Sequence, residues 1–336
     1  EEIFRQVEEM VVNSRGGERW LSNPKPTWNE NGELLSVDYS SFDRSLRKAQ
    51  RKYRHKVLVT RAFMLGFGHV PRKNLFGNDK EILNPLWTKK MTNFATDLKR
   101  HMQEHHPGAI LVFDLFDEPL EKYVPMMQEV VKILREINPE WKFTFACCDF
   151  FPELLDTINF WNLPMNGNRT SRVVIEQIRQ AGGELSVYNP PEYAYNTALT
   201  NPRGAYIWLW RHNVRYVYQW VVNCWRERGE RGSDAYRSAS WIAPGEKGPL
   251  NTLRMEATRD GIEDYEYLSL LRREGDRLRA TRPELSARAE DLLEQAHKLA
   301  WRTANDERNV VITQNPELFD QFHRQAGALL DEMSRH

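Results

Sequence analysis

The sequence predicts an α/β fold, and within that class a (β/α)8 TIM-type barrel, irregular or incomplete at its N-terminus, with a C-terminal helical segment. Short apolar runs alternate with helical patterns of ten or more residues, which is typical of βαβ units and a parallel sheet. Loops lengthen after the predicted strands, as in barrels that carry an active site there. The nucleotide-binding fingerprints are missing, because residues 66–68 (GFG) lack the third glycine and no GxxxxGK[ST] occurs.

The elements of the first half follow from apolar spacing and from the residues that break it. Helical spacing predicts helices at 3–12, 43–53 and 85–105, and the last of these ends at Pro107 and Gly108. Continuous apolar runs predict strands that are covered on both faces at 56–65 and 110–116. A weak strand around 18–28 and one before residue 1 would complete the barrel.

The second half continues the alternation. Helices are expected at 123–137 and 171–181, and strands at 142–148, 157–161, 184–188 and 216–223. Residues 252–334 have a largely helical pattern. We therefore expect residues 1–275 to form the barrel and residues 276–336 a helical extension packed on it.

Composition excludes several functional classes. The 336 residues include 47 Lys+Arg and 47 Asp+Glu, and this zero net charge argues against a nucleic-acid binder. The three cysteines have no spacing typical of a disulfide framework or a zinc site. Apolar stretches are too short for a membrane span. We expect no cofactor, no metal, and no nucleic-acid or membrane partner, while the oligomeric state stays open.

The beginning of the sequence bears on processing. It starts with EEIF, without a methionine and already in a helical pattern. This start is consistent with the removal of a signal peptide or an upstream domain. The compartment cannot be predicted from these residues.

The stretch ILVFDLFDEP (110–119) ends an apolar strand in two adjacent carboxylates and a proline. In a parallel barrel, residues just past the strand end face the catalytic mouth, which places Asp117 and Glu118 there. Adjacent strand residues point to opposite faces, so both can reach one ligand only where the chain leaves the ladder, and Pro119 favours that exit. Asp114, further down the strand, is expected to pair with Arg or Lys. A helix N-cap remains an equal alternative for Asp117-Glu118.

Aromatic residues gather near the predicted strand ends. The chain has eleven tryptophans, and flat rings with a polar handle suit the C–H faces of sugars. Core packing is the alternative for each ring alone. The residues expected to bind a glycan substrate are Trp161, Tyr188, Trp220, Asn223, Trp225 and Arg61. Trp208 and Trp210 also lie near predicted strand ends, and Asn162 and Asn189 there could hydrogen-bond ligand hydroxyls. Arg203, Arg211 and Arg215, together with Arg61, could line the cleft.

Two other clusters are given structural interpretations. HMQEHH (101–106) places His101 and His105 on one helix face, but the order is not HExxH, so a solvated helix end is expected. Cys147-Cys148 is interpreted as a pair of small buried residues, because no histidine and acid partners are identifiable.

Several motifs resemble one known family. NTLRMEATRDGIEDYEYLSLL (251–271) resembles the C-terminal signature of glycoside hydrolase family 123-like proteins, close to SLRxExLRDGIEDYEYLxLL. LFDEP (115–119) is similar to the Asp-Glu-Pro of that family, and YVYQWVVNCW (216–225) to its last barrel strand. DYSSFDRSLRKAQ (38–50) is similar to its opening strand-to-helix region. The resemblance covers about residues 20 to 275.

The resemblance implies a (β/α)8 barrel and β-N-acetylgalactosaminidase-type hydrolysis during polysaccharide degradation, with the substrate's 2-acetamido group as nucleophile. Glu118 would be the general acid and then the base, and Asp117 would orient the acetamido group and stabilise the oxazolinium. A secreted or periplasmic location fits this resemblance. The signature helix is expected to dock on the barrel through ion pairs of Arg254, Glu256, Arg259, Asp260, Glu263 and Asp264.

Two alternatives stay open. A retaining barrel glycosidase with a protein nucleophile would need a second acid about 5 Å from Glu118, for which Asp149, Glu153 and Glu192 are candidates. A non-catalytic carbohydrate-binding barrel would have no need for the adjacent acid pair.

Overall fold

The structure is a computed structural model that describes residues 21–53, 57–147, 149–165, 170–188, 198–218, 242–243, 250–303 and 306–336. The chain divides into two compact units. We call Val12–Leu163 with Val173–Ser186 the sheet unit, and Glu1–Val11, Pro164–Arg172 and Val187–His336 the helical unit.

The sheet unit has a mixed α/β fold built on a parallel sheet. Its parallel strands are β3 (Val57–Thr60), β6 (Ile110–Asp117), β7 (Lys142–Ala146) and β8 (Phe160–Pro164). β9 (Glu184–Tyr188) lies next to β8, and β3 pairs with β6 on the side away from β7. Every residue of β6 from Leu111 to Phe116 is buried, so both faces of this strand are covered, as its continuous apolar sequence predicts.

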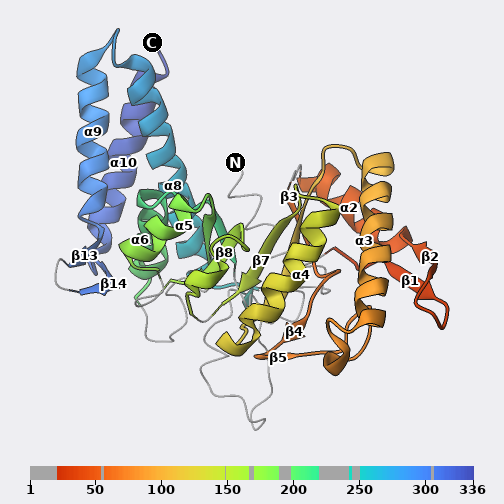
Figure 1. The fold of residues 1–336 in the computed structure, drawn as a ribbon. Helices are drawn as coiled ribbons and strands as arrows, with labels where there is room; N and C mark the ends of the chain where they lie inside the picture. The colour runs from red at the N-terminus through yellow and green to blue at the C-terminus, as the bar shows by residue number, and fades with distance from the viewer. Residues whose placement is uncertain are drawn as a thin grey trace. The chain divides into compact units, whose positions relative to one another are not determined.

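Helices connect and cover the strands. The helices are α2 (Ser40–Tyr53), α3 (Pro85–His105), α4 (Val124–Ile137) and α5 (Arg172–Gln180). α3 begins where Asn84 accepts a hydrogen bond from the Trp87 amide and proline occupies the first turn. α3 and α4 pack against each other along the sheet (Figure 1). Short 3-10 helices are η1 (Asp79–Glu81), η2 (Glu121–Tyr123) and η3 (Pro152–Leu154).

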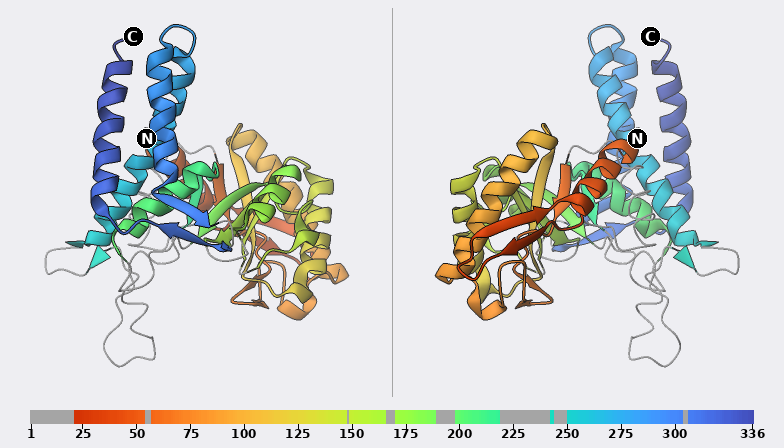
Figure 2. Two further views of the ribbon diagram at one scale, coloured as in Figure 1. Left: turned by 90° about the vertical axis from the view of Figure 1, so that its left-hand side faces the viewer. Right: turned by 90° about the vertical axis from the view of Figure 1, so that its right-hand side faces the viewer.

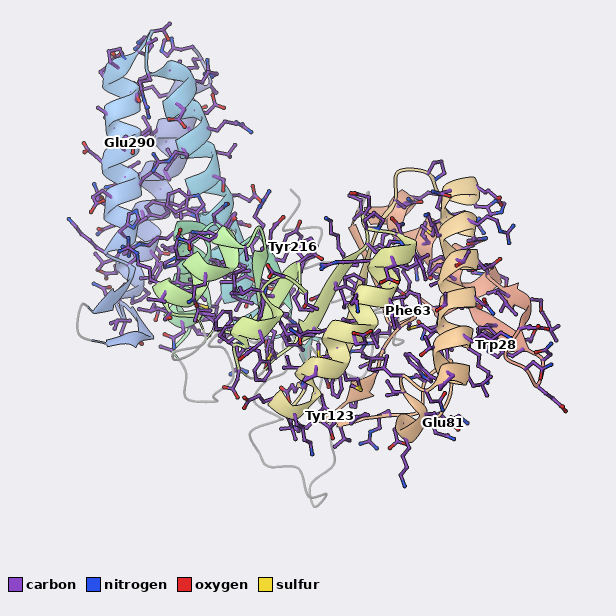
Figure 3. All side chains as sticks on the ribbon, in the orientation of Figure 1. Trp28, Phe63, Glu81, Tyr123, Tyr216 and Glu290 are labelled. Carbon is purple, nitrogen blue, oxygen red and sulfur yellow. The ribbon has the colours of Figure 1, made fainter. Side chains whose placement is uncertain are left out.

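An aromatic cluster forms part of the core of the sheet unit. The ring of Phe63, labelled in Figure 3, lies 4.9 Å from that of Phe113 and 5.7 Å from those of Phe94 and Trp141. Phe63 follows β3 and Phe113 belongs to β6, so the cluster joins the sheet to α3. Such contacts contribute about 0.5–1.5 kcal/mol each beyond area burial.

Two small hairpins complete the sheet unit. β1 (Lys25–Trp28) and β2 (Leu34–Asp38) form an antiparallel pair that lies beside α3 (Figure 1). β4 (Gly66–Phe67) and β5 (Val70–Pro71) form the other, and Gly66 pairs with Phe116 of β6. The second hairpin therefore lies beside the exit of the strand that carries Asp117.

The helical unit contains α6 (Thr200–Arg211), α8 (Leu253–Leu278), α9 (Pro283–His297) and α10 (Pro316–Met333). Its short strands are β10 (Tyr216–Tyr218), β11 (Ile242–Ala243), β12 (Leu250–Asn251), β13 (Ala300–Thr303) and β14 (Asp306–Ile312). α8, α9 and α10 pack on one another and run side by side in all views (Figures 1 and 2). Among the described residues, no helix is both long and apolar enough to cross a bilayer.

The predicted helices and strands agree best with the observed ones where proline, glycine or asparagine marks the end of the element. The predicted helix 85–105 and strand 184–188 coincide with α3 and β9. The predicted strand 56–65 is shorter, since β3 ends at Thr60. The helix 3–12 and residues 219–223 of the last predicted strand lie outside the described residues. The expected boundary at 275 falls inside α8.

Two elements of the helical unit were not predicted. α6 carries nearly continuous apolar sequence, with buried residues from Pro202 to Leu209, and such a segment shows no helical stripe. The β13–β14 hairpin interrupts the stretch 252–334 that was predicted to be helical. Trp208 and Trp210, predicted near strand ends, belong to α6.

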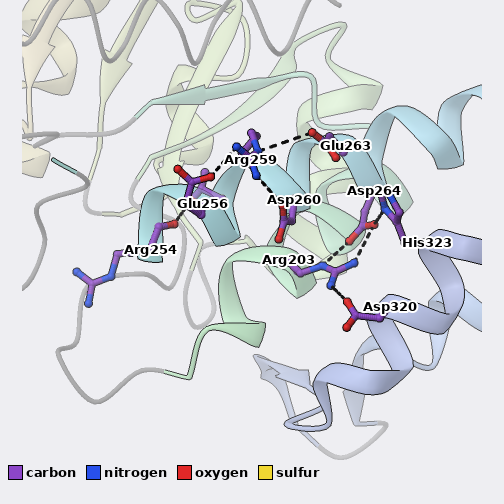
Figure 4. A network of polar contacts seen from close by, with 10 residues as sticks. Arg203, Arg254, Glu256, Arg259, Asp260, Glu263, Asp264, Asp320 and His323 are labelled. Carbon is purple, nitrogen blue, oxygen red and sulfur yellow. Dashed lines mark hydrogen bonds and ion pairs between the residues drawn. The ribbon is translucent and has the colours of Figure 1, made fainter. Parts of the chain in front are cut away.

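The signature motif forms the first part of α8, and one of its acids organises the helical unit (Figure 4). Asp264 is fully buried and accepts hydrogen bonds from Arg203 of α6 at 2.8 and 3.2 Å. It also pairs with His323 of α10, at 2.9 Å. Asp264 therefore forms a buried ion pair with helices of its own unit, and docking of the signature helix on the barrel stays a prediction.

The other signature charges behave differently. Arg259 pairs with Glu256, Asp260 and Glu263 of its own helix. These are exposed contacts between near neighbours, which contribute little stability. Arg203, expected as a cleft residue, is instead buried in the pair with Asp264, which corrects that prediction.

Gly261 has a steric role within the same motif. A Cβ atom there would lie 3.0 Å from both the Cα atom of Arg203 and the carbonyl oxygen of Pro202. The glycine thus permits the close approach of α6 and α8.

Candidate active site

The chain leaves the regular ladder at the end of β6. The β6–β7 register shifts between Asp114 and Asp117, and Glu118 adopts a left-handed conformation with φ 54°. This backbone conformation is rare outside glycine, and the following proline disfavours it further. Such a residue costs about 1–3 kcal/mol and persists only when its surroundings hold it.

Backbone contacts hold Glu118 in place. Its amide donates to the Ala146 carbonyl at the end of β7, at 2.7 Å. Pro119 is buried, whereas the side chains of Asp117 and Glu118 are partly exposed. The strained turn thus presents two adjacent carboxylates at the carboxyl end of a buried strand.

The helix-cap alternative for Asp117 and Glu118 is not supported. The cap residues of η2 and α4 are Leu120 and Tyr123, and neither uses a side-chain cap. The N-cap positions of both helices are therefore occupied by other residues.

His69, in the β4–β5 hairpin, contacts Glu118 through both ring nitrogens. Its Nε2 lies 3.3 Å from Glu118 Oε2, and its Nδ1 lies 2.8 Å from the Glu118 carbonyl oxygen. The His69 amide donates to the Asp117 carbonyl oxygen at 3.3 Å, and His69 itself has φ 71°. Two left-handed residues therefore support each other across the hairpin and the strand exit.

Arg61 and Phe67 extend the same surface. Arg61 Nε donates to Asp114 Oδ2 at 2.9 Å, which confirms the predicted pairing of Asp114 with a basic residue. The Arg61 guanidinium also lies 5.9 Å from the ring centroid of Phe67, within the range of a cation–π contact. Phe67 is 50% exposed and stands two residues before His69. An exposed aromatic side chain and a cation therefore accompany the carboxylates.

Of the predicted sugar-binding residues, some are buried in the structure and others lie outside the described residues. Trp161 is completely buried and packs against Phe145 and Phe150 at 5.4 and 5.1 Å. Its ring is enclosed by the core, because it comes from the buried strand β8 rather than from a loop. Tyr188, at the end of β9, is also buried. Trp220, Asn223 and Trp225 lie outside the described residues.

The other candidates can be placed briefly. Asn162 is buried and accepts a hydrogen bond from the Ser186 hydroxyl at 3.3 Å. Asp149 and Glu153 are exposed. Cys147 is buried, as expected. Asn189, Glu192 and Cys148 lie outside the described residues.

His69 and Phe67 were missed by the sequence analysis, which considered GFG (66–68) only as a nucleotide-binding fingerprint. The sequence did contain a clue, because the glycine-rich connection after β3 follows a strand that pairs with β6, the strand that carries the acids. What the sequence did not contain was the pairing of Gly66 with Phe116, which brings the hairpin to Glu118.

A family profile and a solved structure both relate this chain to glycoside hydrolase family 123. The profile of the glycoside hydrolase 123 catalytic domain matches residues 27–271. A family 123 glycoside hydrolase from Clostridium perfringens, whose structure was solved to explain glycolipid glycan hydrolysis, has a similar fold, with a TM-score of 0.56 and 15% identity. The match covers 93% of this chain and 57% of that chain. This chain therefore spans a little over half the length of the solved enzyme.

A second solved structure, the endo-β-1,4-mannanase from Thermotoga petrophila, matches with a TM-score of 0.44 and 12% identity, over 68% of this chain and 61% of that one. A search of curated protein sequences found no match. The profile match extends over most of the chain and contains both the Asp-Glu-Pro exit and the signature helix. The chain belongs to the family of glycoside hydrolase 123 catalytic domains.

Proposed function

We propose that this chain is a retaining glycosidase that cleaves a β-linked N-acetylgalactosamine or a related 2-acetamido sugar with help from the substrate's own acetamido group. One observation carries the proposal: Glu118 is held in a strained left-handed turn with its partly exposed carboxylate against His69. Strain of this kind persists where surrounding contacts enforce it, and it clusters at active sites. Family membership supplies the reaction class.

Glu118 protonates the glycosidic oxygen in this mechanism and then activates water as a base. Asp117 orients the acetamido group and stabilises the positive charge of the oxazolinium. Because the substrate provides the nucleophile, both acids can come from one strand exit. His69 positions the Glu118 carboxylate through the contact at 3.3 Å.

Sugar binding is assigned to the exposed residues beside the acids. Phe67 offers a ring face for the C–H surface of a sugar, and Arg61 offers donors for hydroxyl or acidic groups. Trp220, Asn223 and Trp225 remain candidate contacts from the rest of the chain, whereas Tyr188 is buried at the end of β9. Trp161 is fully buried, so we assign it to the core.

The architecture proposed around this site is a closed (β/α)8 barrel within residues 1–275, with residues 276–336 as a helical extension. The parallel order of β3, β6, β7 and β8 supports this proposal, as does the packing of α9 and α10 on α8. The proposed partner is a glycan.

The decisive experiment compares aryl β-glycosides with and without a 2-acetamido group. The variants are Asp117→Asn, Glu118→Gln and His69→Ala, with Glu121→Gln as the matched control, because Glu121 is exposed and only three residues away. Loss of a general acid–base group costs about 10²- to 10⁴-fold. We expect losses of that size in kcat/KM for Glu118→Gln, a smaller loss for His69→Ala, and none for Glu121→Gln.

Leaving-group dependence separates the two acids. A dinitrophenyl leaving group needs no protonation, so Glu118→Gln should retain glycoside cleavage on that substrate better than on a phenyl glycoside. Asp117→Asn should lose activity on both, because it acts on the acetamido group. Turnover of plain galactosides or glucosides by the unmodified chain would contradict substrate assistance and favour a protein nucleophile. Sugar binding without any turnover would favour a binding barrel.

A further inference from the structure

Three metal-ligating side chains meet in the sheet unit, on elements that the proposed glycosidase site does not use. Asp43 lies in the first turn of α2, His101 in the last part of α3, and His106 just beyond the end of α3. Asp43 Oδ1 lies 2.8 Å from His101 Nε2 and 2.9 Å from His106 Nε2. The three ligand atoms lie within 4.8 Å of one another.

The cluster is shielded from solvent. The side chains of Asp43, His101 and His106 are 16%, 11% and 3% exposed, respectively. The sequence pattern predicted a solvated helix end here, which is wrong for His101 and His106. The neighbouring His105 is 57% exposed. Contacts between α2 and the end of α3 bury His101 and His106 and leave His105 exposed. The local sequence does not reveal this difference.

Two of the three ligand–ligand separations are close to those around a tetrahedral ion, and the third, between the two imidazole nitrogens, is at most 4.8 Å. Two ligands at about 2.0 Å from Zn²⁺ at the tetrahedral angle lie about 3.3 Å apart. The observed separations of 2.8 and 2.9 Å between Asp43 and the two imidazoles need only a small expansion to admit an ion. Two imidazole nitrogens and one carboxylate oxygen form a donor set that suits Zn²⁺ better than Mg²⁺ or Ca²⁺.

Neighbouring groups orient the donors. The Tyr39 ring stacks on His101 with centroids 3.6 Å apart and an interplanar angle of 5°. The Tyr39 hydroxyl donates to Asp97 Oδ2 at 3.0 Å, and the His106 amide caps α3 by donating to the Met102 carbonyl at 2.9 Å. These contacts restrict the orientation of the His101 ring and the position of the His106 backbone.

The charged groups of the cluster are the Asp43 carboxylate and the Arg47 guanidinium beside it. Burial acts to raise the pKa of Asp43, but hydrogen bonds from His101 and His106 outweigh it and hold the pKa below its ordinary value. A bound ion would replace these two hydrogen bonds, with the imidazole protons released to solvent or moved to Nδ1. Arg47 is the basic side chain paired with Asp43, at 3.9 Å from Oδ2, and it is 51% exposed. Its guanidinium can rotate into solvent when an ion binds.

We propose that Asp43, His101 and His106 bind one divalent transition-metal ion of the zinc class, with a fourth position open to water. The ion would tie the start of α2 to the end of α3. The site rests on contacts separate from those of Asp117 and Glu118, so it stands whether or not the chain hydrolyses glycosides.

The test uses the untagged full chain, stripped with a chelator and titrated with Zn²⁺ and Co²⁺. The variants are Asp43→Asn, which preserves shape, and His106→Ala, with His105→Ala as the matched control from the same helix end. Calorimetry measures stoichiometry and affinity, and the visible absorption of Co²⁺ reports its coordination geometry. Thermal unfolding with and without Zn²⁺ gives a second readout.

We expect one Zn²⁺ per chain, the strong visible absorption of four-coordinate Co²⁺, and a higher Tm with Zn²⁺, in the unmodified chain and in His105→Ala. Loss of an outer-shell partner costs about 10- to 100-fold in affinity, so Asp43→Asn should bind at least about 100-fold more weakly. If His106→Ala fails to fold by circular dichroism, His101→Gln replaces it. Absence of binding, a weak octahedral Co²⁺ spectrum, or unchanged affinity in Asp43→Asn would overturn the proposal and leave a hydrogen-bonded cluster.

Discussion

Replacing Asp264 by alanine should destabilise the helical unit severely, because Asp264 neutralises a buried arginine. Its side chain is fully buried and that of Arg203 is 10% exposed. The replacement removes two hydrogen bonds from Arg203, at 2.8 and 3.2 Å, and one contact with His323, at 2.9 Å. Arg203 would keep Asp320 and the Phe319 carbonyl oxygen, at 2.7 and 3.2 Å.

The magnitude follows from the burial of the pair. Removing one partner of a buried ion pair costs about 3–5 kcal/mol, since the other charge stays desolvated. Asp320 provides the matched control, because it contacts the same guanidinium but is 56% exposed. Exposed pairs contribute about 0–1 kcal/mol, so Asp320→Ala should cost no more than that.

Urea denaturation followed by far-ultraviolet circular dichroism measures both losses, and a second probe, tryptophan fluorescence, checks the cooperativity of the transition. The double replacement Arg203→Met with Asp264→Leu should recover much of the stability lost in Asp264→Ala, because both buried charges are removed and only the more exposed Asp320 and His323 lose a partner. Equal small losses for Asp264→Ala and Asp320→Ala would refute the reasoning that burial makes this pair essential.

Two further predictions concern the same unit. The hydrogen bond to Asp264 raises the pKa of His323 despite partial burial; its contribution to stability is therefore present below about pH 6.5 and is lost as the pH rises through the folded pKa. His323→Gln should flatten this decline in the free energy of unfolding, and an unchanged pH profile would contradict it. Gly261→Ala should destabilise by about 1–3 kcal/mol, because its Cβ would lie 3.0 Å from the Arg203 backbone. Gly327→Ala, whose nearest atom would be 3.5 Å away, should stabilise its helix by about 0.5–1 kcal/mol; equal Tm shifts for the two variants would contradict the steric account.

Two residues of the signature motif have clear structural roles in the helical unit. Within RDGIEDYEYL, Gly261 allows two helices to approach and Asp264 neutralises the arginine that one of them carries. The exposed Arg259 and its neighbours add pairs within one helix turn. The motif therefore identifies the family through residues that build the helical unit, whereas the proposed chemistry lies at Glu118.

The sequence predicted most of the secondary structure of the sheet unit well. Strong breakers and apolar periodicity act over a few residues, so α3, α4, β6 and β9 were anticipated closely. α6 was missed because its apolar residues surround the whole helix and leave no stripe. The β13–β14 hairpin was missed because its pairing depends on contacts between strands, which local helical spacing does not reveal.

The candidate site shows the same division. The sequence by itself determined the acid pair at the end of a buried strand and the proline that ends the ladder. Only the tertiary structure decided that Glu118 is left-handed, that His69 reaches its carboxylate, and that Trp161 is enclosed in the core. The same holds for Asp43, which is 58 positions from His101 in the chain but 2.8 Å from it in space. Spacing along a sequence encodes local geometry, whereas side chains from distant segments meet only through the packing of whole elements.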